Sequence, residues 1–209
     1  MNTISYRNIA DSIDFYEKVG IKSIETPWYV TKEVMDATKP SFIKEGDDYY
    51  IPKNDKYLVA SAEQSFLYLM FKGQLLPGWY QSVTPCYRFE PIDSIHRKVF
   101  MKNELIFVAD AECTVDFLRE NQLERMIELA KSFFEKIIMD TEDGFLSCHD
   151  FIEKKEVPQE KSIINFDLMY KGIELGSYGI RKYKNYALWV YGTGCAEPRL
   201  SLAAKNIKK

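Results

Sequence analysis

The sequence predicts an α+β fold in which an antiparallel β-sheet is flanked by helices. Helical and strand-like periodicities alternate along the chain, and most strand-like runs are joined by hairpins rather than by crossover helices. No internal repeat and no linker interrupts the 209 residues, so we expect a single domain spanning residues 1–209.

Turn and capping residues place the elements of the first half. Gly20 follows an apolar stripe of helical spacing and is a typical residue just beyond a helix end. Ser61 and Gln64 form the pattern of a capping box at the start of a second helix. We expect helices over residues 6–19 and 61–72, and strands over 21–26, 49–51, 57–59, 79–90 and 98–108.

The second half begins with the longest amphipathic pattern of the chain, over residues 115–138, which predicts a long helix. Residues 145–160 are polar and irregular, so we expect a loop there. Three strand-like runs and a short helix follow, over residues 163–168, 173–177, 186–191 and 199–205.

Composition is that of an ordinary globular protein, with 46% hydrophobic and 28% charged residues. The net charge of −3 gives no support to nucleic-acid binding, which relies on Lys and Arg. The first residues do not resemble a secretion signal, and no apolar run is long enough to span a membrane. We therefore expect the protein in the cytoplasm. In that reducing compartment, four widely spaced cysteines without a CxxC pair are expected to be free thiols.

The segment from residue 85 to 104 carries the most chemistry. Arg88 and Glu90 lie two apart on a predicted strand, so both side chains point to one face. Arg88 can bind a phosphate with two hydrogen bonds, Arg97 can reach a second phosphate from the loop, and Phe100 can stack on a base. The pattern suits a nucleotide site, although a solvated strand pair with surface charges has the same spacing.

This segment resembles motif 2 of the class II aminoacyl-tRNA synthetases, Arg-x-Glu, a loop, and then Arg-x-x-Phe. The first helix and the strand ending at Pro27 resemble motif 1, and the run from Gly192 through Gly194 to Arg199 resembles motif 3. The resemblance implies a class II catalytic core, a homodimer, and ATP with Mg²⁺. It assigns catalysis to Arg88 and Arg199, and ATP binding to Arg88, Glu90, Arg97, Phe100 and Arg199.

Further segments are similar to the amino acid:[carrier protein] ligases, relatives of the zinc-dependent seryl-tRNA synthetases of methanogens. They are residues 76–78, 86–91, 100–104, 119–125 and 193–195. The similarity implies that a small amino acid is activated as an adenylate and passed to the phosphopantetheine thiol of an acyl or peptidyl carrier protein. It also implies that an anticodon-binding domain is absent and that tRNA is an unlikely partner.

The same similarity implies a zinc ion held by Cys86, Glu124 and Cys195, with Glu128 as the alternative glutamate. Without the family, the two cysteines are read as buried packing residues. Candidate contacts of the amino acid are Asn103, Glu104 and Ser177. His96 lies in the motif 2 loop and is a candidate phosphate ligand, whereas His149 is expected on a surface loop.

Two other functions compete with this interpretation. A minimal synthetase paralogue would acylate a tRNA, a protein or a metabolite instead of a carrier. A non-catalytic subunit would keep the fold only to bind an amino acid or a partner. The complete set of predicted ATP-binding residues argues against the non-catalytic subunit, because such a domain does not need it.

Overall fold

A computed structural model describes residues 3–41, 43, 50–51, 55–89, 93, 95–139 and 152–205. Its centre is a seven-stranded sheet in which β1 pairs with β5 in parallel and all other neighbours are antiparallel. The strands in spatial order are β1 (Lys22–Ser23), β5 (Gly78–Tyr87), β6 (Val99–Val108), β10 (Trp189–Glu197), β9 (Ile173–Arg181), β8 (Ile164–Tyr170) and β7 (Ile152–Glu156). The predicted α+β class is confirmed.

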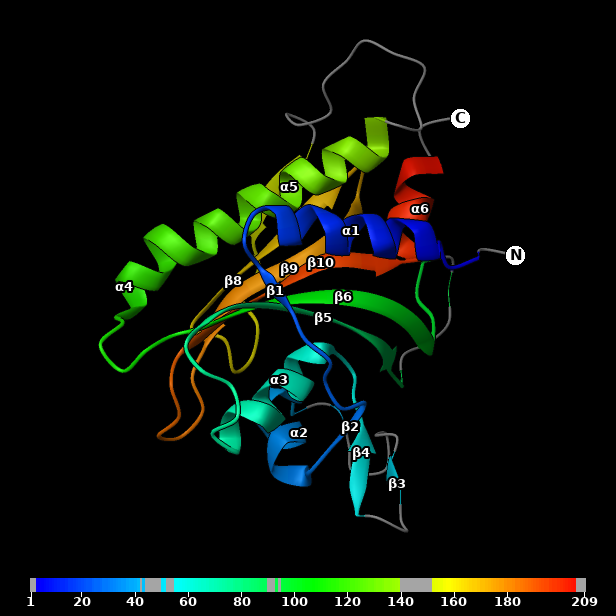
Figure 1. The fold of residues 1–209 in the computed structure, drawn as a ribbon. Helices are drawn as coiled ribbons and strands as arrows, with labels where there is room; N and C mark the ends of the chain where they lie inside the picture. Colours follow the sequence, from blue (N-terminus) through cyan, green and yellow to red (C-terminus); the bar gives the residue numbers. More distant parts are fainter. Residues whose placement is uncertain are drawn as a thin grey trace.

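One face of the sheet is covered by helices from both ends and the middle of the chain (Figure 1). These are α1 (Tyr6–Lys18), α4 (Val115–Phe117), the π-helical segment η2 (Leu118–Leu123), α5 (Glu124–Met139) and α6 (Arg199–Lys205). The larger hydrophobic core lies beneath them and contains Phe133, Phe134 and Tyr178, all fully buried. Burial of such side chains at roughly 1.5–3 kcal/mol each is what holds these helices on the sheet.

The other face carries a smaller layer of α2 (Lys32–Thr38), α3 (Ala62–Phe71) and a three-stranded sheet of β2 (Tyr29–Val30), β4 (Lys56–Leu58) and β3 (Tyr50–Ile51) (Figure 1). A second core joins this layer to the large sheet through Phe66 and Trp189, both fully buried. This layer covers only part of the face.

Most predicted elements are confirmed, and the exceptions have physical reasons. Ser61 accepts the α3 cap bond from Glu63 N, while the Gln64 side chain accepts from Ala60 N, one residue further back than a capping box requires. The long helix is interrupted by η2. The sequence did not predict α2. It also missed β7, which lies in the segment expected to be a loop. Four of the five residues of β7 are charged and exposed, as in an edge strand, so they lack the apolar alternation that indicates a strand.

Two β-bulges change which side chains face the smaller layer. In the β6–β10 pair, Thr193 lies opposite Glu104 and Cys195 lies opposite Asn103, so Gly194 is the extra residue. In the β8–β9 pair, Leu168 lies opposite Gly176 and Met169 opposite Glu174, so Leu175 is extra. Each bulge reverses the alternation of faces beyond it.

Within the described residues, no helix is both long and apolar enough to cross a membrane.

Candidate functional site

A cleft of about 480 Å³ lies between the open part of the sheet and the α2–α3 layer. Its volume falls within the roughly 300–1,000 Å³ of small-molecule sites. Strands β5, β6, β9 and β10 form its floor, and α2, α3 and the segment around Gln159 form its walls. The cleft thus brings together residues that are far apart in the sequence.

Arg88 and Phe100 face the cleft from neighbouring strands. Cys86 pairs with Phe100 across β5 and β6, and Arg88 follows two residues later on the same face. The Arg88 guanidinium carbon lies 5.1 Å from the centroid of the Phe100 ring, and Arg88 Nε donates to Ala60 O at 3.2 Å. These contacts hold the guanidinium beside the Phe100 ring, so the predicted phosphate contact and the predicted base contact are neighbours in the structure.

Arg199 enters the cleft from the first residue of α6. Its Nη1 donates to Glu174 Oε1 at 2.7 Å, and only 13% of the Arg199 side chain is exposed. Glu174 lines the cleft as well, and the sequence analysis missed it. Strand alternation counted back from Ser177 puts Leu175, but not Glu174, in the cleft. With the bulge at Leu175, Glu174 lines the cleft as well.

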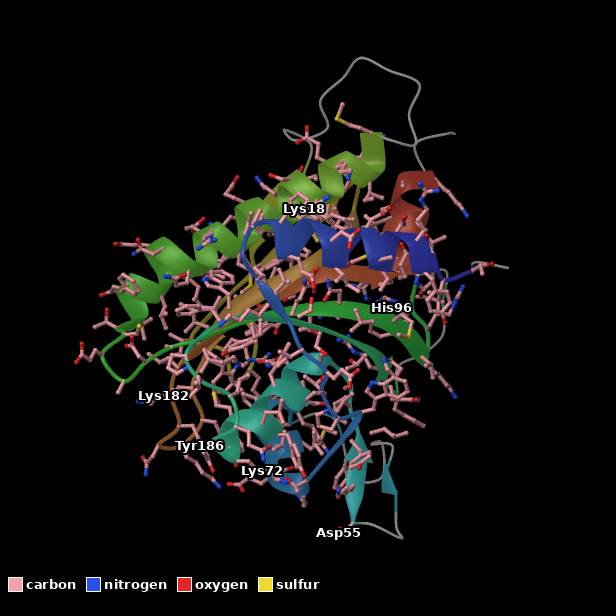
Figure 2. All side chains as sticks on the ribbon, viewed as in Figure 1. Lys18, Asp55, Lys72, His96, Lys182 and Tyr186 are labelled. Carbon is pink, nitrogen blue, oxygen red and sulfur yellow. The ribbon has the colours of Figure 1, made fainter. Side chains whose placement is uncertain are left out.

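The loop before β6 is held by its own hydrogen bonds. Asp93 accepts from the backbone of Ile95 and His96 at 2.7 Å each, and its other oxygen lies 2.6 Å from His96 Nδ1. Arg97 Nη1 donates to the carbonyls of Asp93 and His96. Arg97 and His96 share a small hollow with Phe100 and Arg199, so the predicted phosphate contacts lie beside the predicted base contact. Figure 2 shows His96 near the end of β5 and the beginning of β6. Glu90 lies outside the described residues.

Glu104 lies on the cleft floor with 1% of the residue exposed. Lys102 Nζ lies 2.9 Å from each of its carboxylate oxygens. Burial raises the pKa of Glu104 above its usual value, while Lys102 lowers it. The buried pair therefore supplies one anion and one cation to the middle of the cleft.

Ser177 belongs to a hydrogen-bonded network of polar groups on the β8–β9 side of the cleft, which also includes Asp167. Its hydroxyl donates to Asn165 Oδ1 at 2.9 Å and accepts from Gln159 Nε2 at 3.0 Å. Tyr191 Oη donates to the same Asn165 oxygen at 2.6 Å. The structure thus places Ser177 in the lining of the cleft, and it adds Gln159 and Tyr191, which the sequence analysis did not single out.

Asn103 does not face the cleft, so its prediction as a substrate contact is wrong. It pairs with Val83 and Cys195 on the opposite face of the sheet and is fully buried. Its Nδ2 donates to Ser12 Oγ at 3.0 Å and to Gln81 Oε1 at 2.8 Å, which ties α1 to the sheet.

The predicted zinc site finds no support, for a related reason. Cys86 pairs across the strands with Phe100 on the cleft face of the sheet, whereas Cys195 pairs with Asn103 on the helix-covered face. The sheet therefore separates the two thiols. Glu124 is bonded to Lys154 on the surface. Cys86, Cys113 and Cys195 are free thiols, and the described residues hold no group of three or more side chains suited to a metal ion. Cys148 and His149 lie outside the described residues.

The sequence matches no protein-family model and no curated protein. Solved structures with the same fold do exist. Pyrrolysyl-tRNA synthetase from Desulfitobacterium hafniense superposes with a TM-score of 0.70 at 15% identity, covering 96% of this chain and 69% of that one. The Pyrococcus horikoshii seryl-tRNA synthetase complexed with ATP gives a TM-score of 0.70 at 18% identity, covering 93% and 48%.

The cytoplasmic serine-tRNA ligase of Naegleria fowleri in complex with AMP gives a TM-score of 0.66 at 19% identity and covers 94% of this chain. The chain spans about half the length of the two seryl enzymes, 52% and 48%. At these identities the likeness establishes a common fold, that of a class II synthetase catalytic domain. The expectation that tRNA is not a partner finds no support, since each of these proteins is named for a tRNA.

Proposed function

We propose that this chain activates a small amino acid with ATP, forming an aminoacyl-adenylate and pyrophosphate. The observation that carries the proposal is the convergence of Arg88, Phe100 and Arg199 on one cleft, with the guanidinium of Arg88 over the Phe100 ring and that of Arg199 bonded to Glu174. Two fixed cations beside an aromatic ring suit a nucleoside triphosphate, because the cations can bind its phosphates and the ring can stack on its base. The ATP and AMP complexes of proteins with the same fold support this assignment.

Each residue has a role in the proposed reaction. Phe100 supports the base, while Arg88 and Arg199 offset the negative charge that develops at the α-phosphate during in-line attack by the carboxylate. Glu104 gives up its ion pair with Lys102 and instead accepts hydrogen bonds from the ammonium group of the amino acid. Lys102 is then free to neutralise the substrate carboxylate. Holding both substrates in one cleft converts a bimolecular reaction into one between fixed neighbours.

Magnesium fits the donor set of the cleft. Mg²⁺ is usually held by one or two carboxylates together with the substrate phosphates, rather than by a complete cage of side chains. Glu174 supplies a carboxylate beside Arg199, with 40% of its side chain exposed to the cleft and solvent. Bound there, the ion would neutralise phosphate charge.

Two acceptors are proposed for the activated residue. The sequence resemblance favours the phosphopantetheine thiol of an acyl or peptidyl carrier protein. The names of the structural neighbours favour the 3′ end of a tRNA instead. Both acceptors would attack the same adenylate carbonyl, so the cleft alone does not choose between them. Pairing of two chains, proposed from the resemblance to motif 1, is measured by light scattering of the purified protein.

Amino-acid-dependent exchange of pyrophosphate into ATP tests the activation step across the standard amino acids. Exchange with one or a few amino acids supports the proposal, and ATP binding without exchange favours a non-catalytic binding subunit. Labelled amino acid is then incubated with ATP and either bulk tRNA or phosphopantetheinylated carrier protein. Charging of tRNA without any thioester on the carrier overturns the carrier assignment.

A further inference from the structure

An ion pair that joins α3 to β9 lies among the residues that line the cleft. Arg181 Nη1 donates to Glu63 Oε2 at 2.7 Å, and the two side chains are 8% and 6% exposed. The other oxygen, Glu63 Oε1, accepts from Trp189 Nε1 at 2.7 Å. Both carboxylate oxygens are therefore occupied, and the two charges cancel within the protein. Removing one partner of such a buried pair strongly destabilises a protein, because the other charge stays buried without compensation.

The remaining donors of Arg181 connect this pair to the polar wall of the cleft. Arg181 Nε donates to Ser162 Oγ at 3.0 Å, Nη2 donates to Gln159 Oε1 at 3.3 Å, and the guanidinium carbon lies 4.2 Å from the centroid of the Tyr191 ring. Hydroxyl and amide groups thus line the side of the cleft that continues to Ser177.

The opposite wall is similar. Gln64 Nε2 donates to Thr38 Oγ1 at 3.0 Å and lies 3.1 Å from Met35 Sδ. All three side chains line the cleft. The side chains named on both sides of the ion pair therefore carry uncharged hydrogen-bonding groups, and the charged residues Lys39 and Glu160 line the cleft as well.

Glu63 and Arg181 line the same cleft as Glu104, the proposed contact of the substrate ammonium. In keeping with this, Glu63 contributes to the raised pKa of Glu104, and Glu104 in turn raises the pKa of Arg181, opposing the effect of burial. Because all three residues line one cleft, a group attached to the α-carbon of a substrate at Glu104 can extend toward Arg181 and Glu63.

We infer that the Arg181–Glu63 pair selects an amino acid with a short, uncharged, hydrogen-bonding side chain. This inference rests on the proposed activation of an amino acid. A charged side chain would lose its water shell against a pair whose two charges already neutralise each other. A large aliphatic side chain would offer no hydrogen bond to the hydroxyl and amide groups and would have to separate some of them from their present partners, which polar sites reject strongly.

Asparagine and aspartate test the charge part of the inference, because they have nearly the same shape. Wild-type protein is expected to exchange pyrophosphate faster with asparagine than with aspartate. E63Q leaves the Arg181 charge without its partner, so the aspartate-to-asparagine ratio should rise by about ten-fold or more. R181Q should lower the ratio, and the double variant E63Q/R181Q should return it to the wild-type value. A ratio is unaffected by a uniform loss of active protein.

K182Q is the matched control, since it removes one positive charge at the next position, where the side chain is exposed. Figure 2 shows Lys182 at the periphery near Tyr186 and Lys72. Its aspartate-to-asparagine ratio should equal that of the wild type. Serine, threonine, valine and leucine test the polar part, with the two hydroxyl amino acids expected to react faster.

Calorimetric titration of the same amino acids in the presence of a non-hydrolysable ATP analogue separates the two claims. Selective binding of short polar amino acids without any exchange refutes the proposed activation but supports the selectivity. A wild-type preference for charged or large aliphatic amino acids overturns the inference, as does a folded E63Q protein with an unchanged ratio. Binding of no amino acid at all overturns both.

Discussion

Replacing Arg88 by alanine separates the chemistry of the cleft from the stability of the fold. Among its contacts, Arg88 donates a hydrogen bond to Ala60 O and lies over the Phe100 ring. These two contacts contribute about 0.5–1.5 kcal/mol for the hydrogen bond and roughly 0.5–1 kcal/mol for the ring contact. We expect their loss to lower the free energy of unfolding by about 1–2.5 kcal/mol. At about 2–4 °C per kcal/mol for a chain of this size, the protein stays folded at room temperature.

The effect on activity should be much larger than the effect on stability. If Arg88 stabilises the charge that develops at the α-phosphate, its loss costs about 2.7–4 kcal/mol of transition-state stabilisation, or on the order of 10²–10³-fold in rate. The measurement is kcat for pyrophosphate exchange at saturating ATP and amino acid, with a thermal melt of the same sample. Arg119→Ala is the control, because it removes an exposed arginine of η2 outside the cleft.

Two results would contradict this reasoning. A folded Arg88→Ala protein that keeps at least a tenth of the wild-type kcat would show that Arg88 does not act on the transition state. A rise in KM for ATP with unchanged kcat would show that Arg88 contributes equally to ground-state binding.

Three further predictions concern the fold, the motif 2 loop and the metal. Gly176→Ala should destabilise the protein by roughly 1–3 kcal/mol in thermal unfolding, because its Cβ would lie 2.6 Å from Thr193 Cβ, and an unchanged melting temperature would contradict this packing. The pKa of Asp93 is lowered from its ordinary value of 3.8 to about 2 by hydrogen bonds from the side chain and backbone of His96 and from the backbone of Ile95. These hydrogen bonds should therefore persist above pH 3.8 and be lost as the pH falls toward 2. Carboxyl NMR should show this titration, and a measured pKa near 4 would speak against the loop structure. Removing zinc with a chelator and then restoring Mg²⁺ should leave pyrophosphate exchange unchanged, whereas recovery with zinc alone would reinstate a zinc site.

Local signals in the sequence predicted much of this fold because they have local causes. The residues of α1 share an apolar face, and α6 begins at Arg199 and ends at Lys205 as expected. The cleft residues Arg88, Phe100 and Arg199 were found through their spacing and family resemblance, since strand alternation holds without interruption from Gly78 to Tyr87. Elements that depend on distant partners were missed: α2 is held by packing on α3, and β7 by pairing with β8.

The errors at the centre of the cleft trace to the two bulges. Counted by simple alternation from Tyr191 and Thr193, Cys195 would share the cleft face with Cys86, as a zinc site requires. The extra residue Gly194 turns Cys195 toward α1 instead, where its buried thiol has a raised pKa. An added Cβ at Gly194 would lie 2.9 Å from the ring of Tyr16, whose hydroxyl donates to Gly194 O. The bulge is thus fixed by a contact with α1, which no pattern within β10 reveals.

The bulge in β9 has the opposite consequence, because it supplies a group that the sequence pattern had placed elsewhere. Leu175 turns into the helix-covered core, with 1% of the residue exposed, and Glu174 turns into the cleft to bind Arg199. One irregularity therefore removes a candidate metal ligand, and the other brings a carboxylate beside the arginine of motif 3. Under the proposed function, the cleft would therefore hold a nucleotide with Mg²⁺ without a zinc-bound amino group, and recognition of the amino acid would fall to Glu104 and the residues around Arg181.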